Sequence, residues 1–452
     1  MQAALDKFFK LSERGTRPRT EIAAGVTTFA TMSYIIFLQP AIMSGQLFGF
    51  STGMDFGALV TSTCIAAAFG SILMGVLANY PLALAPGMGE NFFFVLTALP
   101  ICGAALGLEK GAPPAWQLCL GVVFISGILF AILSFCNVRK LLMNAISPSM
   151  KAAIGAGIGL FIAFIGLRNG GIVEIANNNL GMHVSLGATP ETVFLIGLAI
   201  TGGLSLIGIR SCILWGIVAG AATAAAMGLL KFDGLISVPP SPMPVFGQMD
   251  IAGVFTHFLE LIPLLVIFLY MDVFDTLGTL VGVGSRAGLM KNGTLENAER
   301  AFASDAVGTV AGSVCGHSTV TAFIESAAGV EQGGRTGLTA IVAGACFLAA
   351  LFLSPLVGAI AMCQAVTAPA LVIVGAMMMK CIVNVQWEDA SEAIPSFLVI
   401  IGIPFCYSIG DGLILGFVLY PLIKLLAGRA KETGWLSIIM AVVLVLYLLV
   451  RK

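Results

Sequence analysis

Long apolar runs recur from one end of the chain to the other, separated by short polar stretches. Runs of about 16 to 25 residues are long enough for a helix to cross about 30 Å of hydrocarbon. Their apolar positions are continuous and do not alternate with polar ones, which excludes a membrane β-barrel. The pattern therefore predicts an all-α polytopic membrane protein.

The predicted spanning segments form two groups of seven with a polar loop between them. The first group comprises 21–43, 57–78, 82–100, 116–137, 149–168, 191–208 and 211–230, and the second comprises 259–284, 301–314, 318–332, 337–354, 366–386, 393–409 and 411–427. A further apolar run, 435–450, is short for a span, so we expect a peripheral or re-entrant element. Residues 3–14 are expected to form an interfacial helix before the first span.

Lys and Arg are distributed very unevenly over the two sides that these segments define. With the N-terminus in the cytoplasm, 17 of them fall on the cytoplasmic side and three, Lys110, Arg168 and Lys231, fall outside. Such a bias follows the positive-inside rule and supports fourteen segments in a cell membrane. Because each half has an odd number of spans, two homologous halves would insert upside down relative to each other.

Two predicted segments contain breaks in the middle of the membrane. The third segment holds ALAPGMGEN (83–91) and the tenth opens with GHSTVTAF (316–323). Each is the third of its group of seven, and interrupted helices at matching positions are typical of the central binding site of a transporter. Loose helix packing through glycine is the alternative explanation for such breaks.

The amino-acid composition narrows the class of protein further. Of 452 residues, 58% are hydrophobic and 10% are charged, with a net charge of −1, which excludes a soluble protein of this size. No large basic patch is present, so we do not expect a nucleic-acid partner. The ten cysteines are scattered without a CxxC spacing, which gives no reason to expect a metal site.

Acidic residues inside the predicted spans are the main candidates for function, because a buried charge must line a cavity or find a partner. Asp272 and Asp275 are three residues apart and share one helix face with Thr276 and Thr279. Asp275 is the better candidate for a ligand contact, with Thr279 beside it. Asp272 could instead be a structural acid that bonds to the backbone of a neighbouring helix.

Further candidates cluster at the two breaks. Glu90 and Asn91 end the first break, while His317 begins the second and Glu325 follows it. A carboxylate at Glu325 could accept two parallel N–H bonds from a flat heterocycle. His317 could be a packing residue or a proton carrier.

Two more acids have simpler explanations. Asp305, near the start of the ninth segment, is either a helix cap or a second proton site, and capping is favoured. Asp411 opens the fourteenth segment and is expected to cap that helix.

Six ordered motifs resemble the AzgA-like purine permeases of the nucleobase cation symporter 2 family. They are TFATMSYIIFLQP (28–40), ALAPGMGEN (83–91), FDTLGTLVGVG (274–284), SDAVGTVAG (304–312), STVTAFIESAAGV (318–330) and GGRTGLTA (333–340). The likeness spans nearly the whole chain. It implies fourteen helices in two inverted repeats, with a short strand in segments three and ten.

The resemblance also implies a division into domains. After a cytoplasmic N-terminal segment, 1–20, a core domain would comprise 21–137 and 259–354, and a gate domain would comprise 149–230 and 366–427. A peripheral segment, 435–452, would follow. The resemblance leaves room for a homodimer through the gate domain.

The activity that the resemblance implies is proton-coupled uptake of adenine, guanine or hypoxanthine. In that family an acid of segment eight and an acid or amide of segment ten hold the base, and the matching residues here are Asp275 and Glu325. Asn91 matches the polar residue of segment three, and Asp305 matches an acid tied to coupling. Together with Asp272, Glu325 and Asp305 are the candidate proton carriers, no cofactor is expected, and sodium coupling stays open.

Three residues depart from the family pattern. Glu90 stands where an apolar residue is usual, His317 replaces a Thr, and Gln39 replaces an Asn before Pro40. Because the two breaks should face each other, we expect Glu90 and His317 to lie close together in the substrate site.

The hypothesis from sequence is a proton-coupled purine importer that works by alternating access, and not an enzyme. The alternatives are a carrier of another planar heterocycle such as xanthine or uracil, or an anion carrier on the same architecture. Several carboxylates around the site would repel an anion, which argues against the second alternative.

Overall fold

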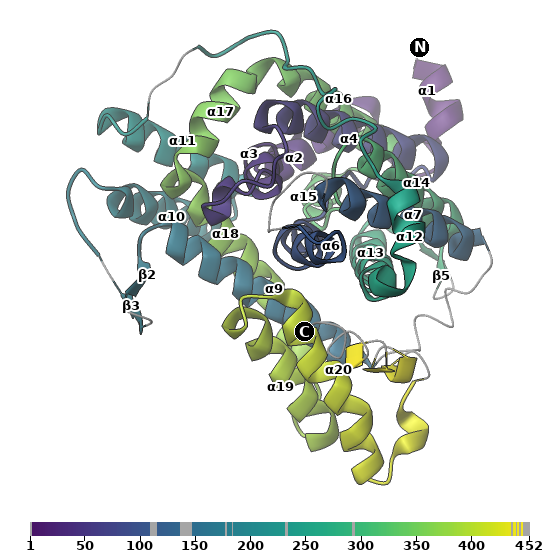
Figure 1. Ribbon diagram of the computed structural model, residues 1–452. Coiled ribbons are helices and arrows are strands. Elements are labelled where there is room, and N and C mark those ends of the chain that lie inside the picture. Colours follow the sequence, from purple (N-terminus) through teal and green to yellow (C-terminus); the bar gives the residue numbers. More distant parts are fainter. Residues whose placement is uncertain are drawn as a thin grey trace.

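The chain folds into two bundles of helices, shown together in Figure 1. The computed structural model describes residues 2–108, 115–135, 147–176, 179–182, 184–230, 234–291, 294–434 and a few positions between 437 and 445. Each predicted spanning segment coincides with one helix, with two consecutive helices as in 21–43, or with a strand followed by helix. Within the described residues, nine helices are long and apolar enough to span a membrane, and three shorter apolar helices accompany them.

One bundle contains the two broken segments, and we call it the strand bundle. From the first half of the chain it takes α2 (Pro18–Met32), α3 (Ile35–Met43), α4 (Phe56–Leu77), β1 (Leu84–Pro86), α5 (Met88–Phe93), α6 (Leu99–Ala105) and α7 (Ala115–Phe135). From the second half it takes α13 (Phe258–Arg286), α14 (Ala298–Val314), β6 (Val320–Ala322), α15 (Ser326–Glu331), α16 (Gly337–Ala350) and α17 (Ser354–Met362).

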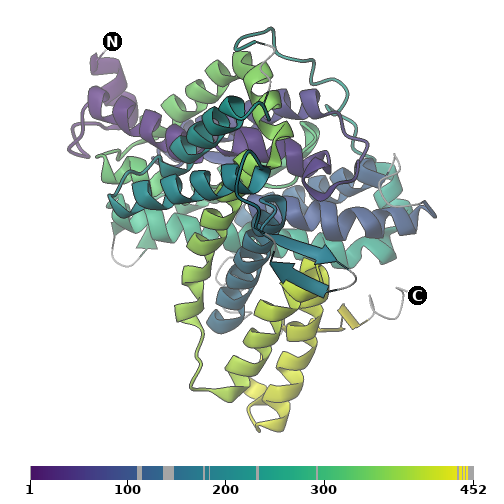
Figure 2. The ribbon, with the colours of Figure 1, turned by 90° about the vertical axis from the view of Figure 1, so that its left-hand side faces the viewer.

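The other bundle, which we call the arm, consists of α9 (Pro148–Asn169), α10 (Pro190–Leu206), α11 (Cys212–Ala226), α18 (Gln364–Met378), α19 (Ala390–Phe405) and α20 (Ile409–Leu426). In Figure 2 its yellow helices, α19 and α20, extend away from the strand bundle. The smaller elements precede the helices or lie in the connections between them: α1 (Gln2–Phe9), β2 (Val173–Ala176), β3 (Asn179–Met182), α12 (Ile251–Thr256), β4 (Met290–Lys291) and β5 (Thr294–Leu295).

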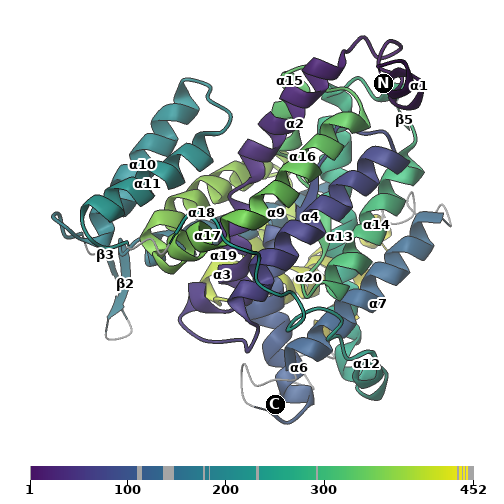
Figure 3. The ribbon, with the colours of Figure 1, turned by 90° about the horizontal axis from the view of Figure 1, so that it is seen from above.

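The helix contacts repeat in pairs between the two halves of the chain. In the strand bundle, α2, α16, α4, α14 and α7 lie side by side in that order (Figure 3), so that the contact of α16 with α4 is matched by that of α7 with α14. In the arm, α9 packs on α18, and the contact of α9 with α19 is matched by that of α18 with α10. This pairing is what a two-fold axis between the halves produces, and it agrees with the predicted inverted repeat.

Local signals explain why most helix starts agree with the prediction. The carboxylate of Asp55 accepts a hydrogen bond from the Ala58 N–H at 2.7 Å and begins α4. Ser147 caps α9 in the same way, with Pro148 in the first turn. Two capping predictions are wrong, however. Asp305 lies inside α14, which begins at Ala298, and the cap of α20 is the Ser408 hydroxyl, since it accepts from the N–H of Asp411 at 3.2 Å.

The predicted N-terminal helix is too long. It ends at Phe9 instead of residue 14, because Lys10 has a φ of 57° and the Asp6 carboxylate accepts hydrogen bonds from the N–H and hydroxyl of Ser12, both at 2.7 Å. Phe9 and Leu11 pack against Leu338 at the start of α16, so this end of the chain is attached to the strand bundle. The predicted element 435–450 lies largely outside the described residues.

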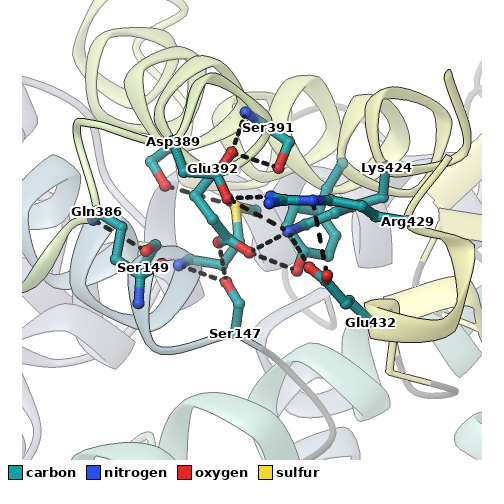
Figure 4. Close-up of polar contacts among 12 residues, drawn as sticks. Ser147, Ser149, Gln386, Asp389, Ser391, Glu392, Lys424, Arg429 and Glu432 are labelled. Atoms are coloured by element: carbon teal, nitrogen blue, oxygen red, sulfur yellow. Dashed lines mark hydrogen bonds and ion pairs between the residues drawn. The ribbon is translucent and has the colours of Figure 1, made fainter. Parts of the chain in front are cut away.

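A buried ionic cluster joins three helices at one end of the arm (Figure 4). The ammonium of Lys424, on α20, is 1% exposed and lies 2.8 Å from Glu392 Oε1 on α19 and 3.0 Å from Glu432 Oε2. Glu392 also accepts hydrogen bonds from the hydroxyls of Ser147 at 2.6 Å and Tyr420 at 3.0 Å. One carboxylate thus connects the first turn of α9, the first turn of α19 and the last turns of α20.

Asp389 completes the cluster at its exposed side. It begins α19 and accepts hydrogen bonds from the Ser391 hydroxyl at 2.7 Å and from Arg429 at 2.6 Å. Hydrogen bonds from Ser391, assisted by Arg429, hold the pKa of Asp389 below its usual range. The cap therefore stabilises the fold above the ordinary Asp pKa, and this stabilisation is lost as the pH falls through the lowered value.

The substitution Lys424→Met tests the cluster. It leaves Glu392 buried without its cation, so the free energy of unfolding should fall by about 3–5 kcal/mol, as measured by SDS titration of the protein in detergent micelles. Adding Glu392→Gln to Lys424→Met removes the uncompensated charge and should recover part of the loss. Equal losses in the single and double variants would contradict this role for the pair.

Candidate functional site

The two broken segments meet as a pair of short strands inside the strand bundle. β1 and β6 pair antiparallel, with Ala85 opposite Thr321, and the Gly87 N–H donates to the Thr319 carbonyl at 2.9 Å just beyond the strands. The residues of both strands are buried. This confirms the strands expected in segments three and ten.

Hydroxyl groups from neighbouring helices satisfy the outer edges of this two-stranded sheet. Ser71, on α4, accepts from the Leu84 N–H at 2.9 Å and donates to the Leu84 carbonyl at 3.0 Å. Thr309, on α14, accepts from the Val320 N–H at 3.1 Å, and its hydroxyl lies 3.2 Å from the Val320 carbonyl. Because α4 and α14 hold corresponding places in the two halves, each strand is supported in the same way by a hydroxyl group of the helix beside it.

Three aspartates lie along one side of the strand pair and bond to threonine hydroxyls. Thr309 donates to Asp272 Oδ2 at 2.8 Å, and Thr276 donates to Asp305 Oδ2 at 2.5 Å. Both carboxylates are fully buried, and the second oxygen of each has no hydrogen-bond partner among the described residues. Asp272 therefore contacts a side-chain hydroxyl of α14, whereas the alternative from sequence was a bond to the backbone of a neighbouring helix.

A chain of hydroxyls connects Asp305 with Asp275. The Thr276 hydroxyl lies 3.0 Å from that of Thr321 in β6, which in turn lies 3.4 Å from Asp275 Oδ2. Asp275 is exposed, in contrast to the other two aspartates. Thr279 is buried one turn further along α13.

The face of α13 that carries Asp275 lines open space. Gly278 and Gly282 follow on the same face, and no described atom lies within 4 Å of the position that a Cβ would take at either glycine. Asp275 can therefore be reached from the end of α13 that leads to Arg286.

Glu325 follows β6 and directly precedes α15. Its Oε1 accepts a hydrogen bond from the Tyr34 hydroxyl at 2.8 Å, and its backbone carbonyl lies 3.4 Å from the hydroxyl of Thr31. Tyr34 is fully buried at the start of α3 and holds the half-buried carboxylate in place. The sequence reasoning did not name Tyr34, although it belongs to the TMSY part of the first motif.

Glu90 and His317, which were expected to lie together, have different neighbours in the structure. The Glu90 carboxylate is buried against Gly87 and beside Thr321. The two ring nitrogens of His317 lie 2.8 Å from the Ser62 hydroxyl and 3.1 Å from Gln39 Nε2. Within the described part of the chain, neither ring nitrogen contacts Glu90.

Asn91 takes part in the same group of contacts as His317. Its amide pairs with that of Gln39 through two hydrogen bonds, one of them 3.1 Å from Gln39 Nε2 to Asn91 Oδ1, and the Ser318 hydroxyl also donates to Asn91 Oδ1. Two of the three departures from the family pattern, Gln39 and His317, are thus in direct contact.

The strand bundle and the arm touch each other near the site. Lys151 of α9 lies over the ring of Phe274, with its Nζ 4.5 Å from the ring centroid, directly before Asp275 in sequence. Arg210, between α10 and α11, forms an ion pair with Glu331 at 3.2 Å. A cavity of about 410 Å³ lies between α2 and this turn, lined by Val26, Thr27, Ala30, Gly208, Arg210, Ser211 and Gln332. None of the predicted site residues lines it.

Relatives with curated descriptions match the chain over almost its whole length. A putative permease of Methanocaldococcus jannaschii is 43% identical, over 98% of this chain and 97% of its own. The adenine permease AdeP of Escherichia coli is 39% identical over 98% of this chain and 96% of its own. The guanine/hypoxanthine permease PbuO of Bacillus subtilis is also 39% identical, over 98% of this chain and all of its own.

A solved structure shares the fold at low sequence identity. The transmembrane domain of the cyanobacterial bicarbonate transporter BicA superposes with a TM-score of 0.63 at 14% identity, and the match covers 88% of this chain and 97% of that domain. The model of the permease family named for xanthine and uracil permeases matches residues 19–412. Together with the full-length relatives, this match shows that the chain belongs to the xanthine/uracil permease family, the nucleobase cation symporter 2 family that its motifs resemble.

Proposed function

We propose that this protein imports purine nucleobases across the cell membrane together with protons. The observation that supports the proposal best is the convergence of Asp275, Glu325 and Asn91, which come from three distant segments, around one strand pair. Relatives that match at full length are described as adenine and guanine/hypoxanthine permeases, which favours a purine as the substrate.

The acids suit a flat heterocycle that carries several N–H groups. Glu325 is held at one oxygen by Tyr34, which leaves the other oxygen and the remaining lone pairs to accept N–H bonds from a base. Asp275 faces open space and can accept a further N–H. Carboxylates that receive N–H donors form hydrogen bonds about twice as strong as neutral ones, which gives both affinity and orientation.

The same acids argue against an anion as the substrate. The fold resembles that of a bicarbonate transporter, but Glu90, Asp272, Asp275 and Glu325 all lie near the strand pair here. Three of these carboxylates, those of Asp272, Asp275 and Glu325, contact hydroxyl groups. Four acids near the strand pair would repel an anion unless protons bind with it.

Protons are the proposed coupling ion, with Glu325, Asp305 and Asp272 as carriers. A carboxylate inside the membrane without a cationic partner gains from taking up a proton, because protonation removes a charge that the surroundings do not neutralise. The hydroxyl chain from Asp305 through Thr276 and Thr321 to Asp275 connects a buried acid with the accessible one. Hydroxyl groups both donate and accept, so they can relay a change in protonation from one carboxylate to the other.

Alternating access is proposed to come from motion of the arm against the strand bundle, which would act as the gate and core domains. Side chains join the two bundles at separate places: Arg210 with Glu331, Lys151 with Phe274, and Asn169 with the Leu47 carbonyl at 3.0 Å. Aromatic side chains also pack across the two bundles, Phe92 against Phe161 and Tyr270 against Phe417, so the proposed motion would slide these apolar surfaces past each other. With the N-terminus in the cytoplasm, the open face of α13 leads to the cytoplasmic side.

The experiment that tests the function is uptake of labelled hypoxanthine or adenine into proteoliposomes under an imposed proton gradient. We expect uptake that an ionophore abolishes and that other purines inhibit, while organic anions do not. Inhibition by bicarbonate or organic anions without inhibition by any purine would contradict the proposal.

The substitution Glu325→Gln should reduce the affinity for the transported base at least about tenfold, the effect of losing a charge-assisted bond of about 1.5–3 kcal/mol. Tyr34→Phe removes the hydroxyl that holds Glu325 and should have a smaller effect in the same direction. Glu299→Gln, at an exposed position of α14, is the control for loss of one negative charge. Wild-type kinetics in the Glu325→Gln variant would rule out its role.

Thr276→Val separates coupling from binding. It keeps the size of the side chain but removes the hydroxyl between Asp305 and Thr321, so proton-driven accumulation should fall several-fold while equilibrium binding of the base changes little. Thr276→Ser retains the hydroxyl and should behave as wild type. If Thr276→Val accumulates substrate normally, the hydroxyl chain has no part in coupling.

A further inference from the structure

A directed chain of hydrogen bonds runs through the strand bundle and ends on the amide of Asn91. Ser62 of α4, His317 before β6, Gln39 of α3 and Asn91 of α5 follow one another in contact, and each is at most 1% exposed. These residues lie on four separate elements, so only the tertiary structure brings them into line. The chain of hydrogen bonds begins at a backbone carbonyl, which can only accept. This start sets which atom donates in each of the following hydrogen bonds.

The first link decides which ring nitrogen of His317 carries the hydrogen. The Ser62 hydroxyl donates to the Leu59 carbonyl at 3.3 Å, and a carbonyl oxygen can only accept. The same carbonyl takes the hydrogen of Thr63 at 2.6 Å, so the Thr63 oxygen can only accept at its 3.5 Å contact with His317 Nε2. With the Ser62 hydrogen also on the carbonyl, the Ser62 oxygen accepts at 2.8 Å from the same ring nitrogen. His317 therefore carries its hydrogen on Nε2, which leaves Nδ1 as an acceptor.

The second link decides how the two amides are turned. Because Nδ1 of His317 accepts, the group of Gln39 that faces it at 3.1 Å is the NH₂ group. The other hydrogen of that NH₂ group is donated to Asn91 Oδ1, and Gln39 Oε1 accepts from Asn91 Nδ2. Without His317 the reciprocal amide pair could form equally well with both amides reversed, so the imidazole selects one of two arrangements.

The chosen arrangement leaves Asn91 with a single free group. Its oxygen already accepts from Gln39 and from Ser318, while its NH₂ group has two hydrogens and donates one of them to Gln39. No described residue accepts the second hydrogen. Asn91 can thus offer the strand-pair site an N–H donor but not an acceptor.

We propose that Ser62, His317 and Gln39 are positioning residues that fix Asn91 as a hydrogen-bond donor toward the substrate. This inference rests on the proposed function for its ligand. It selects a base that presents an acceptor to Asn91, either a carbonyl oxygen or an unprotonated ring nitrogen, while Asp275 and Glu325 take the N–H groups. His317 then acts through its neighbours and does not itself carry the coupled proton.

The direction of the chain can be measured without any transport assay. The full-length protein with His183→Gln and His257→Gln retains His317 as its single histidine, and ¹⁵N labelling of histidine reports which ring nitrogen is protonated. At neutral pH we expect a neutral ring with hydrogen on Nε2. A ring with hydrogen on Nδ1, or on both nitrogens, would overturn the proposal.

The link to substrate choice is tested by competition between hypoxanthine and adenine, which carry an acceptor and a donor at the same ring position. Gln39→Glu replaces the NH₂ group by an acceptor, so His317 Nδ1 and Asn91 Oδ1 both lose their donor and Asn91 is no longer held in one orientation. Its oxygen then becomes available to the site as well as its N–H. The ratio of inhibition constants for the two bases should change about tenfold, the value of one mismatched hydrogen bond. A ratio within twofold of wild type would overturn the proposal.

Ser62→Ala provides a second variant that lies outside the substrate site. Without the Ser62 hydroxyl, His317 can carry its hydrogen on either ring nitrogen. The ratio of the inhibition constants for hypoxanthine and adenine should therefore shift in the same direction as in Gln39→Glu. Thr61→Ala on the same helix is the matched control, because its hydroxyl donates to the Pro240 carbonyl at 2.8 Å and is not part of the chain. If wild-type protein takes up no purine at all, the proposed function fails, whereas the histidine spectrum still decides whether the chain has this direction.

Discussion

The pairing of β1 with β6 is the contact on which the rest of the site depends. Backbone N–H and C=O groups inside a membrane must all find partners within the protein, and two three-residue strands can satisfy only one edge of each other. Ser71 and Thr309 satisfy the outer edges from α4 and α14. Once the strands are fixed, the segment after β1 places Asn91 beside Ser318, and the segment after β6 places Glu325 beside Tyr34.

Three acids beside this strand pair, Asp272, Asp275 and Glu325, are hydrogen-bonded to hydroxyl groups. A salt bridge would hold each charge permanently, whereas a hydroxyl can serve a carboxylate in either protonation state by donating or accepting. The buried pair of Lys424 and Glu392 at the end of the arm shows the contrast, because there a fixed ion pair ties three helices together. The molecule thus places hydroxyls beside the strand pair and a fixed ion pair at the end of the arm.

Much of this arrangement could be predicted from the sequence because membrane-spanning helices are recognisable as long apolar runs. The fourteen segments, the breaks at 83–91 and 316–323, and the acids Asp275 and Glu325 all follow from hydropathy and from the cost of a charge in lipid. The six motifs identified the family by their resemblance to its members. The starts of α14 and α20 were misplaced, because the first turns of these helices are polar and the apolar run begins later.

Contacts between side chains from distant segments were decided by the tertiary structure alone. Sequence placed Glu90 and His317 at facing breaks and so suggested a pair, but the packing of α3 and α4 brings Gln39 and Ser62 to the imidazole instead. Likewise, nothing in a linear pattern shows that Tyr34 reaches Glu325 or that Lys424 is buried. The physical reason is that hydropathy records how much of a segment meets lipid or protein, whereas a hydrogen bond depends on the relative rotation and height of two helices, which packing sets.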